Sequence, residues 1–200
     1  MKHRFSLMPI AALAMFAGNA SADWSFGGYV ESMSLNPRVA AREGVDDTAW
    51  ALGFNADYFS DNLMSASLGS ALVMYDDNRE FRQQVEVIGG FDDGDVRTAS
   101  SDASAILIYA DLGPRLTFGV NESAYFSAKA GFSTFFASER SIGSCSDCYS
   151  EDIDIDGGMY VKAALGRSFE RVSIGFVYSQ YLDDDKGVSD GIQFLIATGF

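Results

Sequence analysis

Along most of the chain, apolar residues recur at every second position rather than at every third or fourth. Trp50, Leu52 and Phe54 share one parity, for example, while Gly53 and Asn55 take the other. A period of two indicates β-strands whose two faces meet different surroundings. The pattern predicts eight strands, at Trp24–Leu35, Thr48–Phe59, Leu63–Tyr75, Ala103–Val120, Ala124–Phe136, Met159–Ser168, Arg171–Tyr181 and Ser189–Phe200.

The connections between these strands alternate in length, which is typical of antiparallel strands that run up and down. Most acidic residues of the chain fall in the long connections. We therefore expect one strongly negative end. The short connections are 60–62, 121–123 and 169–170, and the long ones are 36–47, 76–102, 137–158 and 182–188.

Pro114 interrupts the fourth predicted strand. Proline has no N–H to donate to a β-ladder. We therefore expect either a β-bulge at Pro114 or an earlier turn at Gly113-Pro114.

The bulky apolar set faces either the interior or the exterior of the sheet. An eight-stranded barrel encloses only a modest set of side chains, whereas every predicted strand offers several large ones. The opposite set is mainly Gly, Ser, Ala and Asn with scattered charges, which suits a narrow interior. An outward apolar band suits a bilayer, and closure leaves no unpaired strand edge in lipid. The sequence thus favours an all-β, eight-stranded antiparallel up-and-down transmembrane β-barrel, with a soluble periplasmic barrel as the alternative.

The first 22 residues differ from the rest of the chain. Lys2 and Arg4 give a basic start, residues 7–16 form an apolar run, and Ala20-Ser21-Ala22 is a small-residue cleavage sequence. These features predict a signal peptide at 1–22 and an exported barrel domain at 23–200. No apolar run of about 20 residues follows, which excludes membrane-spanning helices.

The last predicted strand ends in an aromatic residue preceded by apolar residues at alternate positions, namely Ile192, Phe194, Ile196 and Phe200. With this pattern the chain resembles the small outer-membrane β-barrel proteins of Gram-negative bacteria, in particular the eight-stranded OmpA- and OmpX-type barrels. The resemblance implies that the outer-membrane assembly machinery reads the terminal strand. We expect a location in the cell outer membrane with both termini periplasmic.

Two functions fit such a barrel. In the first, it is a monomer with a structural or surface-interaction role, whose acidic loops contact lipopolysaccharide, the environment or a host surface. In the second, its lumen is a narrow, porin-like channel for small solutes or ions. The sequence favours the first and does not identify the ligand of the loops. Loop binding would be lost on deleting 76–102 or 137–158, and transport would depend on the lumen instead.

Charge and the histidine content exclude other functions. The formal net charge of −14 argues against a nucleic-acid partner, because phosphates would be repelled. The single histidine, His3, leaves with the signal peptide. Without it nothing titrates near neutrality to activate a serine, as lipid A deacylases and acyltransferases of similar size require. We expect neither an enzyme nor a resident cofactor.

If the bulky set faces lipid, six charged side chains point into the lumen: Glu31, Asp57, Asp111, Arg115, Lys129 and Lys162. Isolated charges there would carry a large desolvation cost, so we expect paired networks. The residues placed to supply hydrogen bonds are Asn55, Tyr109, Tyr125 and Tyr160. Such a network either plugs the barrel or, if its pairs exchange partners, gates a pore.

Cys145 and Cys148 form a C-x-x-C sequence. No second pair and no histidine could complete a zinc site. In an exported chain this spacing therefore favours a small disulfide loop over redox chemistry.

Asp152, Asp154 and Asp156 precede Gly157 in the pattern of the first half of an EF-hand calcium loop. The residue at the position of the bidentate glutamate is Ala163, so this is not an EF-hand. In an extended segment the three carboxylates share one face and could bind calcium or another divalent cation. The alternative is an acidic loop that enters a strand.

Overall fold

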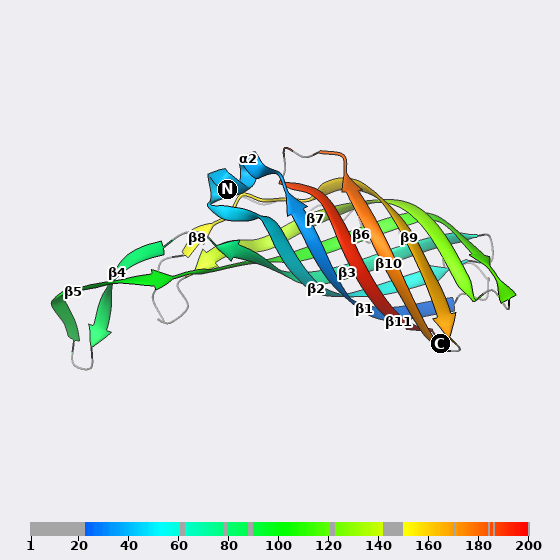
Figure 1. Cartoon of the computed structure of the whole chain (residues 1–200), viewed down its shortest axis with the longest axis horizontal. Coiled ribbons are helices and arrows are strands. Elements are labelled where there is room, and N and C mark those ends of the chain that lie inside the picture. The colour runs from blue at the N-terminus through cyan, green and yellow to red at the C-terminus, as the bar shows by residue number, and fades with distance from the viewer. Residues whose placement is uncertain are drawn as a thin grey trace, which may run out of the picture.

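Eight antiparallel strands close into one barrel (Figure 1). The computed structural model describes residues 23–60, 63–77, 80–87, 90–120, 123–141, 150–169, 171–183, 185 and 187–199, with 80–100 as backbone alone. The barrel strands are β1 (Asp23–Leu35), β2 (Val45–Phe59), β3 (Met64–Asp77), β6 (Asp102–Phe118), β7 (Ala124–Ser141), β9 (Gly158–Phe169), β10 (Val172–Tyr181) and β11 (Val188–Gly199). They pair in the order β6-β3-β2-β1-β11-β10-β9-β7, and β6 pairs with β7 to close the ring. The predicted fold class is confirmed.

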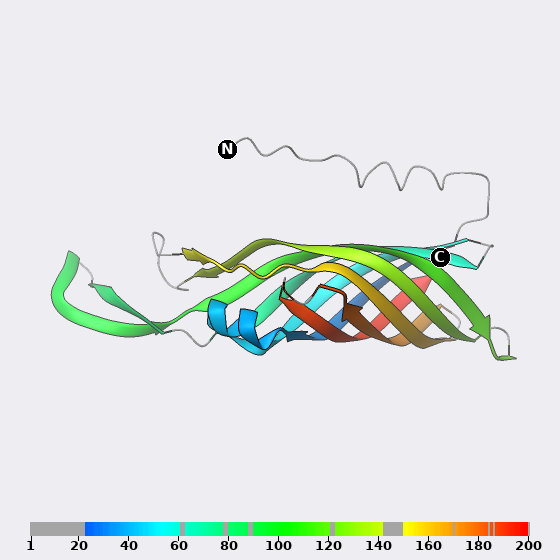
Figure 2. The ribbon, with the colours of Figure 1, turned by 90° about the horizontal axis from the view of Figure 1, so that it is seen from above.

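The two ends of the barrel differ. The turn end carries the short connections after β2, β6 and β9, together with residues 23 and 199, which lie on the paired strands β1 and β11. The loop end carries the long connections. Among them, β4 (Glu80–Val87) pairs with β5 (Gly90–Ser100) in a ribbon that curves away from the barrel (Figure 2).

Two further elements at the loop end were not predicted. They are the short strand β8 (Ser150–Asp152), which pairs with β7, and the helix α2 (Pro37–Glu43). Asn36 accepts a hydrogen bond from the Arg38 N–H at the start of α2, and Gly44 ends it at φ 71°. No helix among the described residues is long and apolar enough to cross a membrane.

Alternate side chains point in and out, as β2 shows. Trp50 and Phe54 are 56% and 76% exposed, whereas Asn55 and Asp57 are buried. Large apolar side chains on the other barrel strands are exposed in the same way. The bulky set therefore forms an outward band, and the alternative of an apolar set filling the interior is wrong.

The strands are tilted against the barrel axis. Following paired residues once round from Ala105 of β6 leads back to β6 at Arg115, ten residues further along. Such a stagger accompanies closure of a barrel. It places inward side chains from distant parts of the chain at the same height in the lumen.

The expectation of a β-bulge at Pro114, or of an earlier turn at Gly113-Pro114, is wrong. The strand β6 continues through Pro114, which pairs with Met64, and the pairing with β7 keeps its register from Leu112↔Ala130 to Arg115↔Ser127. The Arg115 N–H donates to the carbonyl of Leu63, next to the start of β3, so the Pro114 nitrogen faces β7, where one ladder bond is lost without a shift. The register of β6 and β7 shifts instead between Ser104 and Ile106.

Tyrosine rings lie over inward-facing glycines, as with Tyr109 over Gly69. A Cβ added at Gly69 would overlap this ring. We expect Gly69→Ala to lower the free energy of unfolding by about 1–3 kcal/mol, because the ring must leave its position. Unfolding in urea measures the effect. Gly28→Ala is the matched control, since its Cβ would lie 3.8 Å from the nearest atom; equal effects of the two substitutions would contradict the prediction.

Candidate functional site

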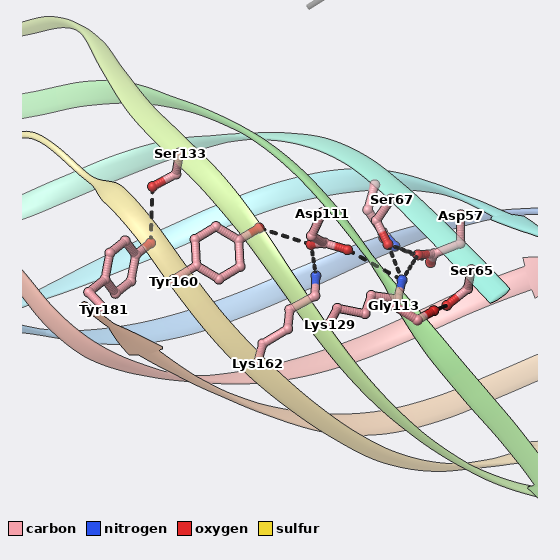
Figure 3. A network of polar contacts seen from close by, with 11 residues as sticks. Asp57, Ser65, Ser67, Asp111, Gly113, Lys129, Ser133, Tyr160, Lys162 and Tyr181 are labelled. Carbon is pink, nitrogen blue, oxygen red and sulfur yellow. Dashed lines mark hydrogen bonds and ion pairs between the residues drawn. The ribbon is translucent and has the colours of Figure 1, made fainter. Parts of the chain in front are cut away.

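The six predicted lumen charges all lie on inward positions of barrel strands. Four of them form a chain of ion pairs in the interior (Figure 3). Lys129 Nζ lies 3.2 Å from Asp57 Oδ1 and 3.4 Å from Asp111 Oδ1. The Lys162 ammonium contacts the other Asp111 oxygen. The chain thus alternates acid, base, acid and base across β2, β7, β6 and β9.

Neutral side chains complete this network. Asn55 Nδ2 donates to Asp57 at 2.5 Å, and the Tyr160 hydroxyl donates to Asp111 at 2.9 Å. Both were expected to do so. Ser67, which was not singled out from the sequence, donates to Asp57 and accepts from Lys129.

Glu31 and Arg115 form no ion pair with another described residue, although the sequence led us to expect pairing of all six charges. Glu31 is buried toward the loop end, where it lines a cavity of about 20 Å³ together with Lys162. Arg115 lies at the turn end. Its guanidinium carbon is 4.0 Å from the centroid of the Phe59 ring and 4.1 Å from that of Tyr125. For Arg115, two aromatic rings thus provide the contacts where the sequence predicted an ion pair.

The loop-proximal half of the interior is apolar, which corrects the expectation of a polar lumen throughout. We call this cluster the apolar plug. It includes side chains from strands, from α2 and from the segment before β9, namely Met33, Leu35, Val39, Val73, Leu107, Ile153, Ile155 and Val188. All of these are buried. The plug therefore closes the barrel on the side of the long loops.

Arg140 links several elements at the loop end of the barrel, which we call the mouth. Its side chain is 1% exposed, and its Nε donates to Asp77 at 2.8 Å. One terminal nitrogen donates to Glu151 at 3.4 Å, and the other to the carbonyls of Glu43 and Gly44 at 2.7 and 3.1 Å. This one guanidinium thereby joins β3, β8 and the end of α2 to β7.

Solved structures share this architecture. The chain is similar to Ail, the attachment invasion locus protein of Yersinia pestis, with a TM-score of 0.51 and 14% identity over 90% of this chain and 98% of that one. Neisserial surface protein A (NspA) matches with a TM-score of 0.46 and 10% identity over 90% of this chain and 96% of that one. No protein-family model matches the chain, and no curated protein matches its sequence. The likeness to Ail shows the fold. It bears out the resemblance to small eight-stranded outer-membrane barrels that the terminal strand indicated.

A second contact at the mouth joins α2 to the segment before β9. Arg42 lies 2.6 Å from Glu43 Oε1 and 3.4 Å from Asp154 Oδ2. Glu43 also accepts from the Asp154 N–H at 3.1 Å. The hydrogen bond to Glu43 raises the pKa of Arg42. Because Arg42 and Asp154 are exposed, this contact is weaker than that of Arg140.

The three aspartates proposed as cation ligands are not gathered at one point. Asp152 lies in β8, Asp154 contacts Arg42, and Asp156 accepts from the N–H groups of Phe135 and Gly157. In the described ranges no three His, Cys, Asp or Glu side chains are grouped to hold a metal ion. Binding of a divalent cation at these residues remains a prediction, beside the alternative of an acidic loop that enters a strand.

The remaining predicted sites are covered only in part. Cys145, Cys148 and Phe200 lie outside the described residues, so the disulfide remains a prediction. Ile192 and Ile196 are exposed on the outer face of β11. Reading of this strand by the assembly machinery also remains a prediction.

Proposed function

We propose that this protein is a surface-interaction barrel of the bacterial outer membrane, with its loop end outside the cell and both termini periplasmic. The outward apolar band matches a bilayer, and the closed ring leaves no strand edge in lipid. Lipopolysaccharide is the neighbour of the acidic loops, where divalent cations would bridge carboxylates and phosphates.

The observation that carries the interaction role is the ribbon β4–β5. It extends beyond the barrel and pairs through Glu80↔Ser100 to Val87↔Gly90 (Figure 2). A long paired hairpin clear of the barrel extends the chain toward a partner, whereas a passive anchor needs only a short turn. The barrel then serves as its rigid base.

The partner expected for these loops is neutral or basic. The chain carries a net charge of −14, and most of its acids fall in the long connections. Ail was solved in complex with the heparin analogue sucrose octasulfate. We do not extend such a polyanionic ligand to this chain, because its acidic loops would repel one.

A channel through the lumen is the second candidate, and the interior argues against it. A solute would have to pass the apolar plug and separate Lys129 from Asp57 and Asp111. Single-channel recording in a planar bilayer tests this. A protein shown to be folded by its heat-dependent gel migration is expected to give no unitary steps, and reproducible steps would favour the channel.

Replacement of residues 80–100 by a four-residue Gly/Ser turn is expected to weaken surface binding while the barrel still folds. The replacement leaves Asp77 in place, which pairs with Arg140. Bacteria that make the intact protein should adhere several-fold more to polylysine-coated beads than to heparin-coated beads, because their loops are acidic. The loop replacement should reduce this preference in part, because residues 80–100 carry only some of the acidic residues of the long connections.

Lys162→Met is the control for this experiment, since it alters the lumen and leaves the loops intact. It should leave the preference for polylysine beads unchanged. Adhesion lost with Lys162→Met but kept after the loop replacement would contradict the proposal.

A further inference from the structure

Arg115 lies in an unusual setting at the turn end of the lumen. Its guanidinium carbon lies over the rings of Phe59 and Tyr125, at 4.0 and 4.1 Å from their centroids. Contacts of this cation–π kind do not use the N–H donors of the guanidinium. The side chain is only partly exposed. The two rings therefore restrict the side chain while its donors stay available.

The guanidinium edge makes no hydrogen bond within the described part of the chain. The Arg115 backbone N–H donates to Leu63, but the side chain is limited to its ring contacts. Arg140, by comparison, donates four hydrogen bonds from its guanidinium. Arg115 thus keeps a row of donors that no acceptor among the described residues uses.

Arg115 lines a cavity of about 40 Å³ in the turn-proximal half of the lumen. Other polar side chains that line it are Asn55, Asp57, Tyr125, Lys129, Lys162 and Gln193. Three of the lining side chains are cations and one is an anion. The Asp57 carboxylate already accepts from Asn55, Ser67 and Lys129. Lys129 and Lys162 also pair with Asp111, so Arg115 is the lining cation that has no ion pair with a described residue.

We propose that this cavity binds a small oxyanion, a phosphate or carboxylate group that enters from the turn end and pairs with the Arg115 edge. A guanidinium edge matches the two oxygens of such a group, which a single ammonium does not. Lys129 and Lys162 line the same cavity and remain paired with Asp57 and Asp111, so the unpaired charge offered to the anion is that of Arg115. The site goes beyond the proposed surface role, since it lies at the opposite end of the barrel.

Nuclear magnetic resonance of arginine Nε–H groups tests the proposal on the folded wild-type protein in a phosphate-free nonionic detergent. Sodium phosphate, sodium acetate and sodium chloride are added at matched ionic strength. The Arg115 signal is expected to shift and saturate with phosphate or acetate and to change little with chloride. A shift that never saturates, or one that Arg167 shares equally, would overturn the proposal.

Arg167 is the matched control, because it lies near the same end, stacks on Phe169 at 5.2 Å, and is exposed on the outer face. Arg115→Gln is expected to weaken phosphate binding by about tenfold or more, as measured by calorimetry, since it removes a charge-assisted pair. Arg167→Gln should change it less than about twofold. Arg115→Lys keeps the charge without the fork and should fall between them. A phosphate affinity of Arg115→Gln equal to that of the wild type would overturn the proposal.

Free phosphate and the phosphate of a lipid headgroup share this chemistry. A second titration with short-chain phosphatidylglycerol separates the two sources. Saturation of the Arg115 signal by inorganic phosphate supports a periplasmic solute, and saturation by the lipid alone supports a headgroup. If neither saturates the signal and acetate also fails, the proposal is wrong.

Discussion

Replacing Lys129 with methionine is expected to lower the free energy of unfolding by about 3–5 kcal/mol. The side chain of Lys129 is 6% exposed, and its ammonium lies between the carboxylates of Asp57 and Asp111. Methionine keeps most of the alkyl volume, so the main loss is the charge. Loss of the ammonium leaves Asp57 without an ion pair in the interior. Burial of an uncompensated carboxylate is far more costly than loss of an exposed pair.

Unfolding in urea from phospholipid vesicles, followed by heat-dependent gel migration, measures this change. Arg38→Met, at an exposed position of α2, should unfold with the wild type. Adding Asp57→Asn to Lys129→Met should restore part of the lost stability, because the unpaired charge is then absent. Unchanged unfolding of Lys129→Met together with altered conductance would show that the network gates a pore and does not hold the barrel together.

The outward band could be predicted from the sequence because the proposed lipid surroundings impose a simple rule. Outward positions between the two interfaces are mainly apolar, so residues such as Trp50 and Phe54 mark the strands whatever their neighbours are. The same parity places Asp57 and Lys129 inside. It does not reveal which charges meet, since this depends on the stagger of the closed barrel, and Arg115 and Glu31 are consequently left apart.

The mouth of the barrel could not be predicted by this rule. Outside the lipid the alternation fades, and Val39, Ile153 and Ile155 look like isolated apolar residues in acidic connections. Their common burial in the plug is a tertiary property. A local signal for α2 was present, since Asn36-Pro37 and Gly44 are a helix N-cap with proline at N1 and a C-terminal glycine.

Arg140→Ala is expected to open the mouth of the barrel without unfolding the barrel. The substitution removes four hydrogen bonds and frees the end of α2. It also removes the ion pair between Arg140 and Asp77, whose side chain is only 3% exposed. Loss of a buried charge partner of this kind costs about 3–5 kcal/mol. The plug side chains of α2 would then rely on apolar contacts, on the exposed Arg42 pair, and on the hydrogen bonds of Glu43 and Asn36 with the Asp154 N–H and the Gly187 carbonyl.

Trypsin cleavage after Arg38 and Arg42 reports this opening, because both residues are exposed but lie in a helix anchored at the mouth. Cleavage of Arg140→Ala should be roughly a hundredfold faster than that of the wild type, as a loss of about 3 kcal/mol implies when opening is rapid. Glu139→Ala, at the exposed neighbouring position on β7, should be cleaved like the wild type. The midpoint in urea should fall much less than for Lys129→Met, because the ion-pair network of the other half remains intact. If trypsin cleavage and urea unfolding of Arg140→Ala give equal losses of free energy, mouth and barrel unfold as one unit instead.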